Sequence, residues 1–576
     1  MRKISVLLTL CVALCCTTQA LAALSLKNVI TGIKNKKVLN NALARLKINQ
    51  EHNNETLTKS EIGEFFSEGP KNIEAAVAPY GYFNPTIKSN LSNRGDAWTA
   101  TYDVELGPKL TVTVANIRIM GPGNINKHIT MAFDKVPLKT GAVFTTEHYD
   151  KTKDLLIDTA HAAGFIDAKY TIDKITINPS AYTCVLDLTL QTGPRYYFGD
   201  VSFSPSPISD SLLKRYIPFK TGDPYSTTTL TDFQQLLSQS GYFKSVIANP
   251  EKDKAVNQQI PIDMQLTRNK QKFYRVGIGY GTGTGPRLLG SINWRWVNKY
   301  GHKFSLNTML SKINNALTAQ YLIPGSKPST DQYTITGTHF TLAPYRTQKS
   351  FGNRLSLADT FKLWGWQQTY QVDFLSERYR FSSNAGYNDA RAVIPGFTWR
   401  RVSTGNILKI TKGSMFSMNW RGASRHAGST VNFIQTNWQY KWVHPLFTKN
   451  FRIILRGQLG YTFINENSIT KLPLSLQFYA GGIYSMRGYN YNSLGPGRYL
   501  MIGSGEIQRR IVGNLWVGTF VDEGNVFNNF PIDPQRGMGL SLIYQTPVGP
   551  LAISLAQAST KKGKPLKFQF SIGPEL

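Results

Sequence analysis

Cysteine is scarce in this sequence. Of the 4 Cys among 576 residues, Cys11, Cys15 and Cys16 lie in one apolar segment at the N-terminus, and only Cys184 lies beyond it. A single cysteine can form neither an intramolecular disulfide nor a Cys-rich metal site, so we expect Cys184 to be a small buried side chain. The folded chain must therefore be stabilised by packing and backbone pairing.

Long apolar runs are missing beyond the N-terminus. Arg2 and Lys3 precede an apolar stretch from Ile4 to Cys16, and small residues that a signal peptidase accepts follow, ending at Ala22. We predict a secretory signal peptide at residues 1–22, with cleavage after Ala22. No later run approaches the roughly 18 apolar residues of a membrane-spanning helix.

Catalytic and metal-binding patterns are absent as well. The 8 His are scattered, with no His-Glu-x-x-His motif and no close acidic or cysteine partners. The Gly-rich stretch at residues 279–285 is similar to a phosphate-binding loop, but no Gly-Lys-Ser/Thr follows it and its flanks alternate like strands. We therefore predict that the protein is not an enzyme and has no catalytic residue, no metal and no cofactor.

Acidic residues are few in the second half of the chain. Through residue 270 there are 30 Lys and Arg against 24 Asp and Glu, whereas residues 271–576 have 35 against 11. Nucleic-acid binding would explain a formal net charge of +30, but the secretory signal and the lack of a clustered basic stripe argue against it. The change in charge predicts a domain boundary near residue 270.

The second half alternates between apolar and polar residues. In residues 451–463 one face reads Phe451, Ile453, Leu455, Gly457, Leu459, Tyr461 and Phe463. A period of two indicates a strand with one apolar face. A soluble sandwich or propeller alternates in this way, and so does a transmembrane barrel, which turns its apolar face to lipid and its polar face inward. Secretion, strands of about ten residues and aromatic residues at strand ends favour the barrel.

The first half contains a repeat. Residues 137–141 (Pro-Leu-Lys-Thr-Gly) return at 218–222 (Pro-Phe-Lys-Thr-Gly), an offset of 81 residues. A helical stretch follows each copy and ends at Gly164-Phe165 or Gly241-Tyr242, and Gly81-Tyr82 marks a third, more divergent copy. Two alternating stretches come after each Gly-aromatic pair. We predict three small α+β domains, each a strand, two helices and two strands, at residues 23–108, 109–194 and 195–269.

Two motifs give the chain a specific resemblance. Residues 478–489 end in Arg487-Gly488-Tyr489, and residues 520–527 contain Asp522-Glu523-Gly524. The repeats resemble POTRA domains, and the motifs are similar to the Arg-Gly-aromatic loop and the Asp-x-Gly strand of the outer-membrane protein assembly superfamily. Three repeats and the chain's length resemble most closely its TamA branch, the outer-membrane subunits of translocation and assembly modules. The resemblance implies three POTRA domains followed by a transmembrane β-barrel of about sixteen antiparallel strands at residues 270–576.

The resemblance also implies a role for these motifs. In the superfamily the Arg-Gly-aromatic loop folds into the barrel lumen, where its arginine pairs with an acid of the wall. Strand parity agrees, because Asp522 and Glu506 lie on faces that can point inward. We expect Arg487 to meet both acids, as a positioning contact without chemistry, and Gly524 to belong to the strand motif. The alternative is that the three charges only fill a polar lumen.

The first and last barrel strands are candidates for a seam. The first contains Gly277 and Gly279, and the last contains Phe568 and Phe570. Glycine weakens a strand, so this seam could open and offer unpaired backbone groups to an arriving strand. Packing against neighbouring strands is the other explanation for the glycines.

These features predict an outer-membrane assembly or translocation factor that helps to insert or secrete β-barrel clients such as autotransporters. The barrel would lie in the bacterial outer membrane, with the POTRA domains in the periplasm. The resemblance implies a large inner-membrane-anchored periplasmic partner of the TamB type, besides client proteins and outer-membrane lipid. The alternative is a two-partner secretion transporter, which passes an exoprotein through the lumen and needs a plug helix. Residues 34–47 are the only stretch that could form one.

Overall fold

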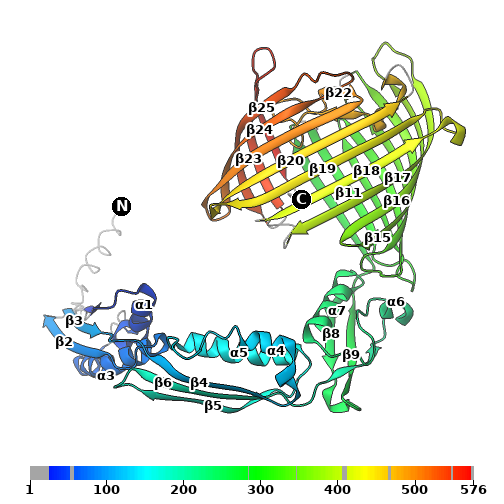
Figure 1. The fold of residues 1–576 in the computed structure, drawn as a ribbon. Helices are drawn as coiled ribbons and strands as arrows, with labels where there is room; N and C mark the ends of the chain where they lie inside the picture. Colours follow the sequence, from blue (N-terminus) through cyan, green and yellow to red (C-terminus); the bar gives the residue numbers. More distant parts are fainter. Residues whose placement is uncertain are drawn as a thin grey trace, which may run out of the picture. The chain divides into compact units, whose positions relative to one another are not determined.

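The computed structural model describes most of the chain from residue 25 onward (Figure 1). The described residues are 25–51, 57–95, 97–282, 285–344, 347–404, 412–464, 469–546 and 549–572. The predicted signal peptide at residues 1–22 lies outside them.

The first repeat forms a three-stranded sheet covered by helices. Its elements are β1 (Ser25–Thr31), α1 (Lys36–Arg45), α2 (Lys47–Gln50), α3 (Lys59–Val77), η1 (Ala78–Tyr80), β2 (Thr86–Arg94) and β3 (Ala97–Glu105). β3 lies in the middle, parallel to β1 and antiparallel to β2. Val38 and Ala42 of α1 are buried in the core of this domain. The stretch considered as a plug helix therefore belongs to the first domain.

The second and third repeats have the same sheet order, with the last strand of each in the middle. The second contains β4 (Thr111–Met120), η2 (Pro122–Ile125), α4 (Lys127–Phe133), α5 (Thr146–Ala162), β5 (Lys169–Asn178) and β6 (Thr183–Gln191). The third contains β7 (Tyr197–Phe203), α6 (Asp210–Lys214), α7 (Thr227–Gln239), β8 (Phe243–Pro250), η3 (Lys252–Lys254) and β9 (Gln259–Arg268). Cys184 of β6 is a buried free thiol. Among the described residues, no helix is both long enough and apolar enough to cross a membrane.

The Gly-aromatic pairs are the joints between successive repeats. Gly81 and Gly164 close their helical segments at φ of +95° and +92°. The carbonyl of Gly81 accepts the Leu110 amide at 2.9 Å, and that of Gly164 accepts the Tyr196 amide at 2.8 Å. A Cβ at Gly164 would lie 2.6 Å from the Tyr225 carbonyl oxygen. Both the left-handed backbone and this close approach require glycine.

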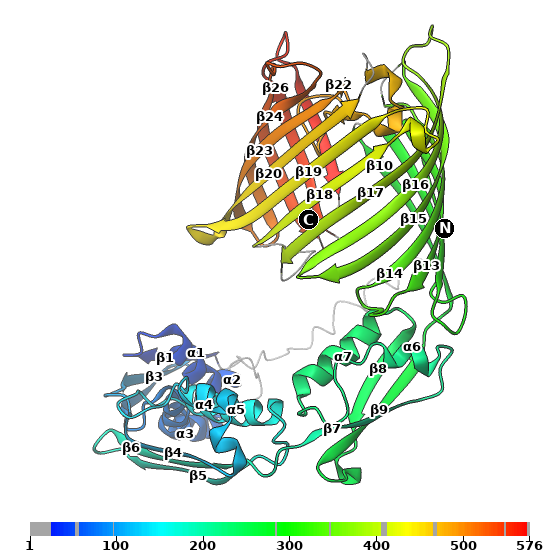
Figure 2. The same ribbon diagram turned by 45° about the vertical axis from the view of Figure 1, so that its right-hand side comes forward.

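The second half forms one antiparallel sheet of 16 strands, as predicted (Figures 1 and 2). Its strands are β10 (Lys272–Gly281), β11 (Gly285–Trp294), β12 (Lys303–Ser311), β13 (Asn314–Pro324), β14 (Gln332–Leu342), β15 (Lys349–Leu363), β16 (Trp366–Arg380), β17 (Asn388–Thr404), β18 (Gly413–Ala423), β19 (Phe433–Leu446), β20 (Thr448–Ile464), β23 (Tyr499–Val512), β24 (Leu515–Phe527), β25 (Gln535–Thr546), β26 (Gly549–Ala558) and β27 (Leu566–Ile572). The short η4 (Arg425–Ala427) lies between β18 and β19. Each strand pairs with its neighbour in this order, and the sheet curls into a barrel. In the described part of the chain, no ladder joins β10 to β27.

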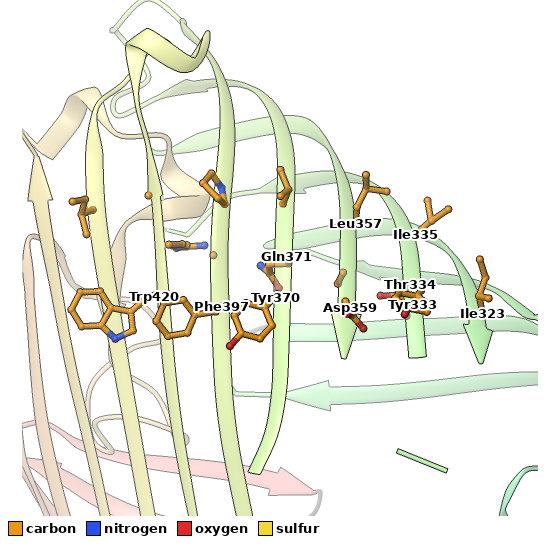
Figure 3. A pocket seen from close by; sticks show the side chains of 17 residues that line it. Ile323, Tyr333, Thr334, Ile335, Leu357, Asp359, Tyr370, Gln371, Phe397 and Trp420 are labelled. Atoms are coloured by element: carbon orange, nitrogen blue, oxygen red, sulfur yellow. The ribbon is translucent and has the colours of Figure 1, made fainter. Parts of the chain in front are cut away.

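Alternate residues point to the two faces of the barrel wall. On β24, Phe520 and Asp522 are 2% and 0% exposed, whereas Val517 and Val521 are 39% and 46% exposed. Figure 3 shows outward-facing rings of Tyr370, Phe397 and Trp420 side by side on β16, β17 and β18. They line a shallow groove of about 760 Å³ whose lining is mostly apolar. The outer face is therefore apolar and aromatic, as lipid contact requires.

Residues 202–218, 232–249 and 263–269 of the third repeat belong to one compact unit with the barrel and contact it there. The turn between β11 and β12 carries Gly301, whose carbonyl accepts the Tyr242 hydroxyl at 2.6 Å. Lys303 donates to the Ser240 carbonyl at 2.7 Å. Tyr242 belongs to the third Gly-aromatic pair, so this pair serves as a joint as the other two do.

Candidate functional site

A long connection between β20 and β23 fills the barrel lumen. We call residues 469–497 the lumen segment. It contains η5 (Ile469–Lys471), η6 (Leu474–Leu476), β21 (Phe478–Ala480) and β22 (Leu494–Gly497). Leu472 and Leu476 are buried against inward-facing side chains of the wall, among them Phe340 and Leu375. We expected a polar inner face, and that expectation is wrong for this part of the wall, where the inner face is apolar and packs against the lumen segment.

The lumen segment brings Arg487 onto two acids of the wall. The amide and Nε of Arg487 donate to Asp522 Oδ2 at 2.9 and 2.8 Å, and Nη2 donates to Asp522 Oδ1 at 2.7 Å. Nη1 donates to Glu506 Oε2 at 2.6 Å. Nη2 also reaches the Ser504 hydroxyl at 3.2 Å. The structure thus brings Arg487, which the resemblance placed in the lumen, onto the two acids that strand parity placed on inward faces.

The Arg487 contacts are strong because they are buried and fully paired. Arg487 is 3% exposed, and its guanidinium carbon lies 3.4 Å from the centre of the Phe520 ring. A second arginine, Arg456, lies 3.5 Å from Glu506 and 3.9 Å from Asp522, so two positive charges face two negative ones. Removing one partner of a buried ion pair leaves an uncompensated charge and typically costs about 3 to 5 kcal/mol. The arrangement can hold a segment in place, and nothing in it provides a reacting group.

The next two residues of the motif contact the last strands. The Gly488 amide donates to Gln569 Oε1 of β27 at 3.0 Å, and a Cβ at Gly488 would lie 2.9 Å from the amide nitrogen of Ala558. Gly488 also has a φ of +88°, which only glycine adopts readily. The Tyr489 hydroxyl shares a hydrogen bond of 2.6 Å with Thr560. In this motif Arg487 binds the two acids, Gly488 allows close approach to the backbone of β26, and Tyr489 reaches Thr560 between β26 and β27.

Gly524 of the strand motif permits close pairing beside the acid. It has a φ of +151°, and a Cβ there would lie 2.0 Å from the carbonyl oxygen of Met501 on β23. A larger residue would push β24 away from β23. Gly524 thus keeps β24 paired closely with β23, the two strands on which Asp522 and Glu506 lie.

A second attachment of the lumen segment was not predicted. Glu377 of β16 is 2% exposed, and its Oε1 accepts the Ser350 hydroxyl at 2.6 Å and the Ser475 amide at 3.2 Å. The Tyr379 hydroxyl donates to the Lys471 carbonyl at 2.9 Å. The scarcity of acids in the second half was the available signal, because any acid on an inward face there is a candidate partner for the loop.

The seam candidates lie on the two strands at the ends of the sheet. On β10, Val276 and Ile278 are 82% and 88% exposed, and Phe568 of β27 is 61% exposed. Phe570 is half-buried. A Cβ at Gly279 would meet nothing within 4 Å, and one at Gly277 would meet only the Leu289 side chain, at 3.7 Å or more. Close packing therefore does not explain these glycines.

Among the described residues, no three His, Cys, Asp or Glu side chains are grouped so that they could hold a metal ion.

Comparison with known proteins gives three family matches. The Omp85 superfamily domain matches residues 272–575, more than half of the chain. The family described as POTRA domain, TamA domain 1, matches residues 28–106. A POTRA family described as a surface antigen variable number repeat matches residues 196–267.

Two curated relatives are outer membrane protein assembly factors named BamA. The one from Neisseria meningitidis serogroup B is 21% identical over 484 residues, which cover 70% of this chain and 60% of that protein. The one from Nitratidesulfovibrio vulgaris is 21% identical over 406 residues, covering 63% of this chain and 49% of that protein. The chain thus spans less than two thirds of the length of either relative. The solved structure of BamA from Haemophilus ducreyi lacking POTRA domains 1–3 matches with a TM-score of 0.63 at 18% identity, over 80% of this chain and 99% of that chain.

Proposed function

This chain belongs to the Omp85 superfamily, and from that membership we propose that it is an outer-membrane assembly factor that inserts or secretes other proteins. Its barrel lies in the outer membrane and its POTRA domains lie in the periplasm. The chain supplies strand edges and docking surfaces, and it carries out no catalytic turnover.

The observation that carries this proposal is the interruption of the sheet between β10 and β27. A closed barrel has no edges, whereas here two end strands have no ladder between them in the described residues. Unpaired backbone donors and acceptors at such an edge bind an arriving strand by β-augmentation. The outward side chains of β10 are more exposed than those of interior strands, which supports access from the membrane.

The filled lumen favours insertion at the seam over passage through the barrel. The lumen segment packs against inward-facing residues of β14 and β16 and is hydrogen-bonded to acids of β16, β23 and β24. A two-partner transporter would have to move this segment aside, and the stretch considered for its plug helix is α1 of the first domain. The transporter alternative therefore lacks support from these two features.

At the finer level, we propose a TamA-like subunit. Three POTRA domains and the match of the first to the TamA family support this assignment. Its partner would be a large inner-membrane-anchored periplasmic protein of the TamB type, and its clients would include autotransporters. The edge strand β2 of the first domain is largely exposed and offers the partner or a client a periplasmic pairing site.

Reconstitution tests the proposal. The full chain in proteoliposomes should accelerate folding of an autotransporter barrel into the bilayer, compared with empty liposomes, as read from its heat-modifiable migration and protease resistance. An exoprotein that crosses the bilayer without any inserted barrel would instead identify a secretion transporter. Copurification in gentle detergent tests the partner: a large periplasm-spanning protein supports the TamA-like assignment, and recovery of lipoproteins contradicts it.

A further inference from the structure

The last strand, β27, is held on one side only by the ladder. Its seven residues pair with residues 551–557 of β26. The described residues show no ladder on its other side. An edge strand has half the hydrogen bonds of an interior strand, and β27 is also the shortest of the sixteen. Some other contact must keep it in place against the barrel.

Gln569 supplies such a contact from the inner face of β27. Its side-chain Oε1 accepts the Gly488 amide at 3.0 Å, and its Nε2 donates to the Tyr489 carbonyl at 3.1 Å. The side chain is 5% exposed, so these bonds do not compete with bulk water. Both partners are backbone groups of the lumen segment. Lys567, one inward position away, contacts the Asn490 amide oxygen.

The lumen segment is itself fixed at the adjacent residue. Arg487 binds Asp522 of β24 through its amide and its guanidinium. One peptide bond therefore separates the attachment to β24 from the attachment to β27. The segment spans β25 and β26 and ties the weak end strand to the well-paired interior of the sheet.

We propose that the lumen segment is a latch for the last strand, and that Gln569 is the positioning residue through which it acts. While the lumen segment is bound to Gln569, β27 stays paired with β26. When the segment shifts, β27 loses these bonds on its inner face and separates from β26 more often. This inference rests on the proposed function in one respect, since it assigns a regulator to the seam at which clients would pair.

Hydrogen exchange measured by mass spectrometry on the full chain in detergent tests the latch. We expect Gln569→Met, which keeps the side chain's shape and removes both bonds, to speed amide exchange in residues 566–572 by roughly tenfold, because a buried polar pair is lost from a local opening equilibrium. Exchange in β19 and β20 should not change. The matched control is Gln557→Met on β26, whose side chain points to the outer face. It should leave exchange in β27 as it was.

A second comparison separates the latch from a general loss of stability. Arg487→Met should speed exchange in β27 by a similar factor, and the double variant should add little, because both residues act through one segment. Equal exchange of β27 in the native chain and in Gln569→Met would overturn the proposal, and so would faster exchange spread evenly over all strands. If Gln569→Met does not fold, Gln569→Glu retains the acceptor for Gly488 and should give a smaller acceleration in β27 alone.

These exchange measurements do not require a client protein. If the native chain fails to assemble clients in proteoliposomes, the proposed function fails while the latch can still be demonstrated. If the chain assembles clients but exchange in β27 is unaffected by Gln569→Met, the latch fails alone.

Discussion

Five hydrogen bonds hold Arg487 against the barrel wall, and its acid partners are almost entirely buried. Moving Arg487 away from these acids would leave buried charges uncompensated, so this residue favours one arrangement of the lumen segment. We expect Arg487→Ala to weaken the attachment by about 3 to 5 kcal/mol. The barrel should still form, because no ladder hydrogen bond is lost, while client assembly should fall.

The measurement for this variant is protease protection of residues 469–497, together with the assembly assay. Arg509→Ala is the matched control, because Arg509 is an exposed arginine on β23 that lies over the Phe451 ring. It should change neither protection nor assembly. Full assembly by Arg487→Ala with unchanged protection would mean that the buried charges only fill the lumen.

We expect one contact at the joint between the second and third domains to depend on pH. The Asp167 carboxylate accepts hydrogen bonds from Lys252 and, at 2.7 Å, from the Tyr196 hydroxyl. The bond from Lys252 is the main cause that lowers the pKa of Asp167 below its ordinary value of 3.8. A carboxyl with a lowered pKa stabilises the folded state fully above the ordinary value and loses this contribution as the pH falls through the lowered one. We expect the joint to keep its strength at neutral pH and to loosen only below pH 3.8.

Exchange of the amides in residues 250–256, corrected for intrinsic rates, checks this at pH 5 and pH 3. The native chain should exchange faster at pH 3, whereas Asp167→Asn should exchange alike at both. The effect is modest because the pair is partly exposed to solvent. Asp263→Asn on β9 serves as the control and should behave like the native chain. A native joint that does not respond to pH would contradict the assigned role of Asp167.

At the scale of elements, β10 contains glycines that no close neighbour requires, and glycine weakens a strand. Gly279 on β10 and Gly337 on β14 both have open space where a Cβ would be. Valine favours strands and glycine weakens them. We expect Gly279→Val to stiffen β10 and to lower client assembly several-fold, whereas Gly337→Val, far from the seam in the sheet order, should leave assembly unchanged. Equal assembly by both variants would show that the seam strand is not used.

The elements that could be predicted are those with a local signal. Alternation located some of the barrel strands, such as residues 451–463, and parity placed Asp522 and Glu506 on the inner face. Glycine before an aromatic residue marked Gly81 and Gly164, because a left-handed residue that ends a helix leaves a trace in the sequence itself. These features depend on neighbours within a few residues, so a single sequence contains them.

At the scale of the whole molecule, the resemblance placed the Arg487 loop in the lumen, but the apolar packing of the lumen segment and its attachment to Glu377 could not be predicted. Glu377 and Ser475 are 98 residues apart and meet only in the folded barrel. On β17, inward Ile394 follows outward Val393, so both faces are apolar there and alternation does not separate them. The apolar packing of the lumen segment therefore depends on distant strands, and no local pattern reports it.

The basic excess of the second half is partly explained by the lumen. Arg421 of β18 donates to Gln435 at 2.7 Å, and Arg452 of β20 donates to Gln508 at 2.7 Å. Arg452 is 3% exposed. These two arginines donate to uncharged side chains, so the wall can carry more basic than acidic residues without an acid for every arginine.

The filled lumen predicts how the intact protein conducts ions. Leu472 and Leu476 are buried between wall residues, so the lumen segment should block the aqueous path through the barrel. In planar bilayers we expect the native chain to show small, infrequent conductance steps, and deletion of residues 469–497 to give a steady, much larger conductance. Deletion of residues 382–386, a connection between β16 and β17, should not change the native trace. A native chain that already conducts like an open porin would contradict both the plugged lumen and the assignment of client entry to the seam.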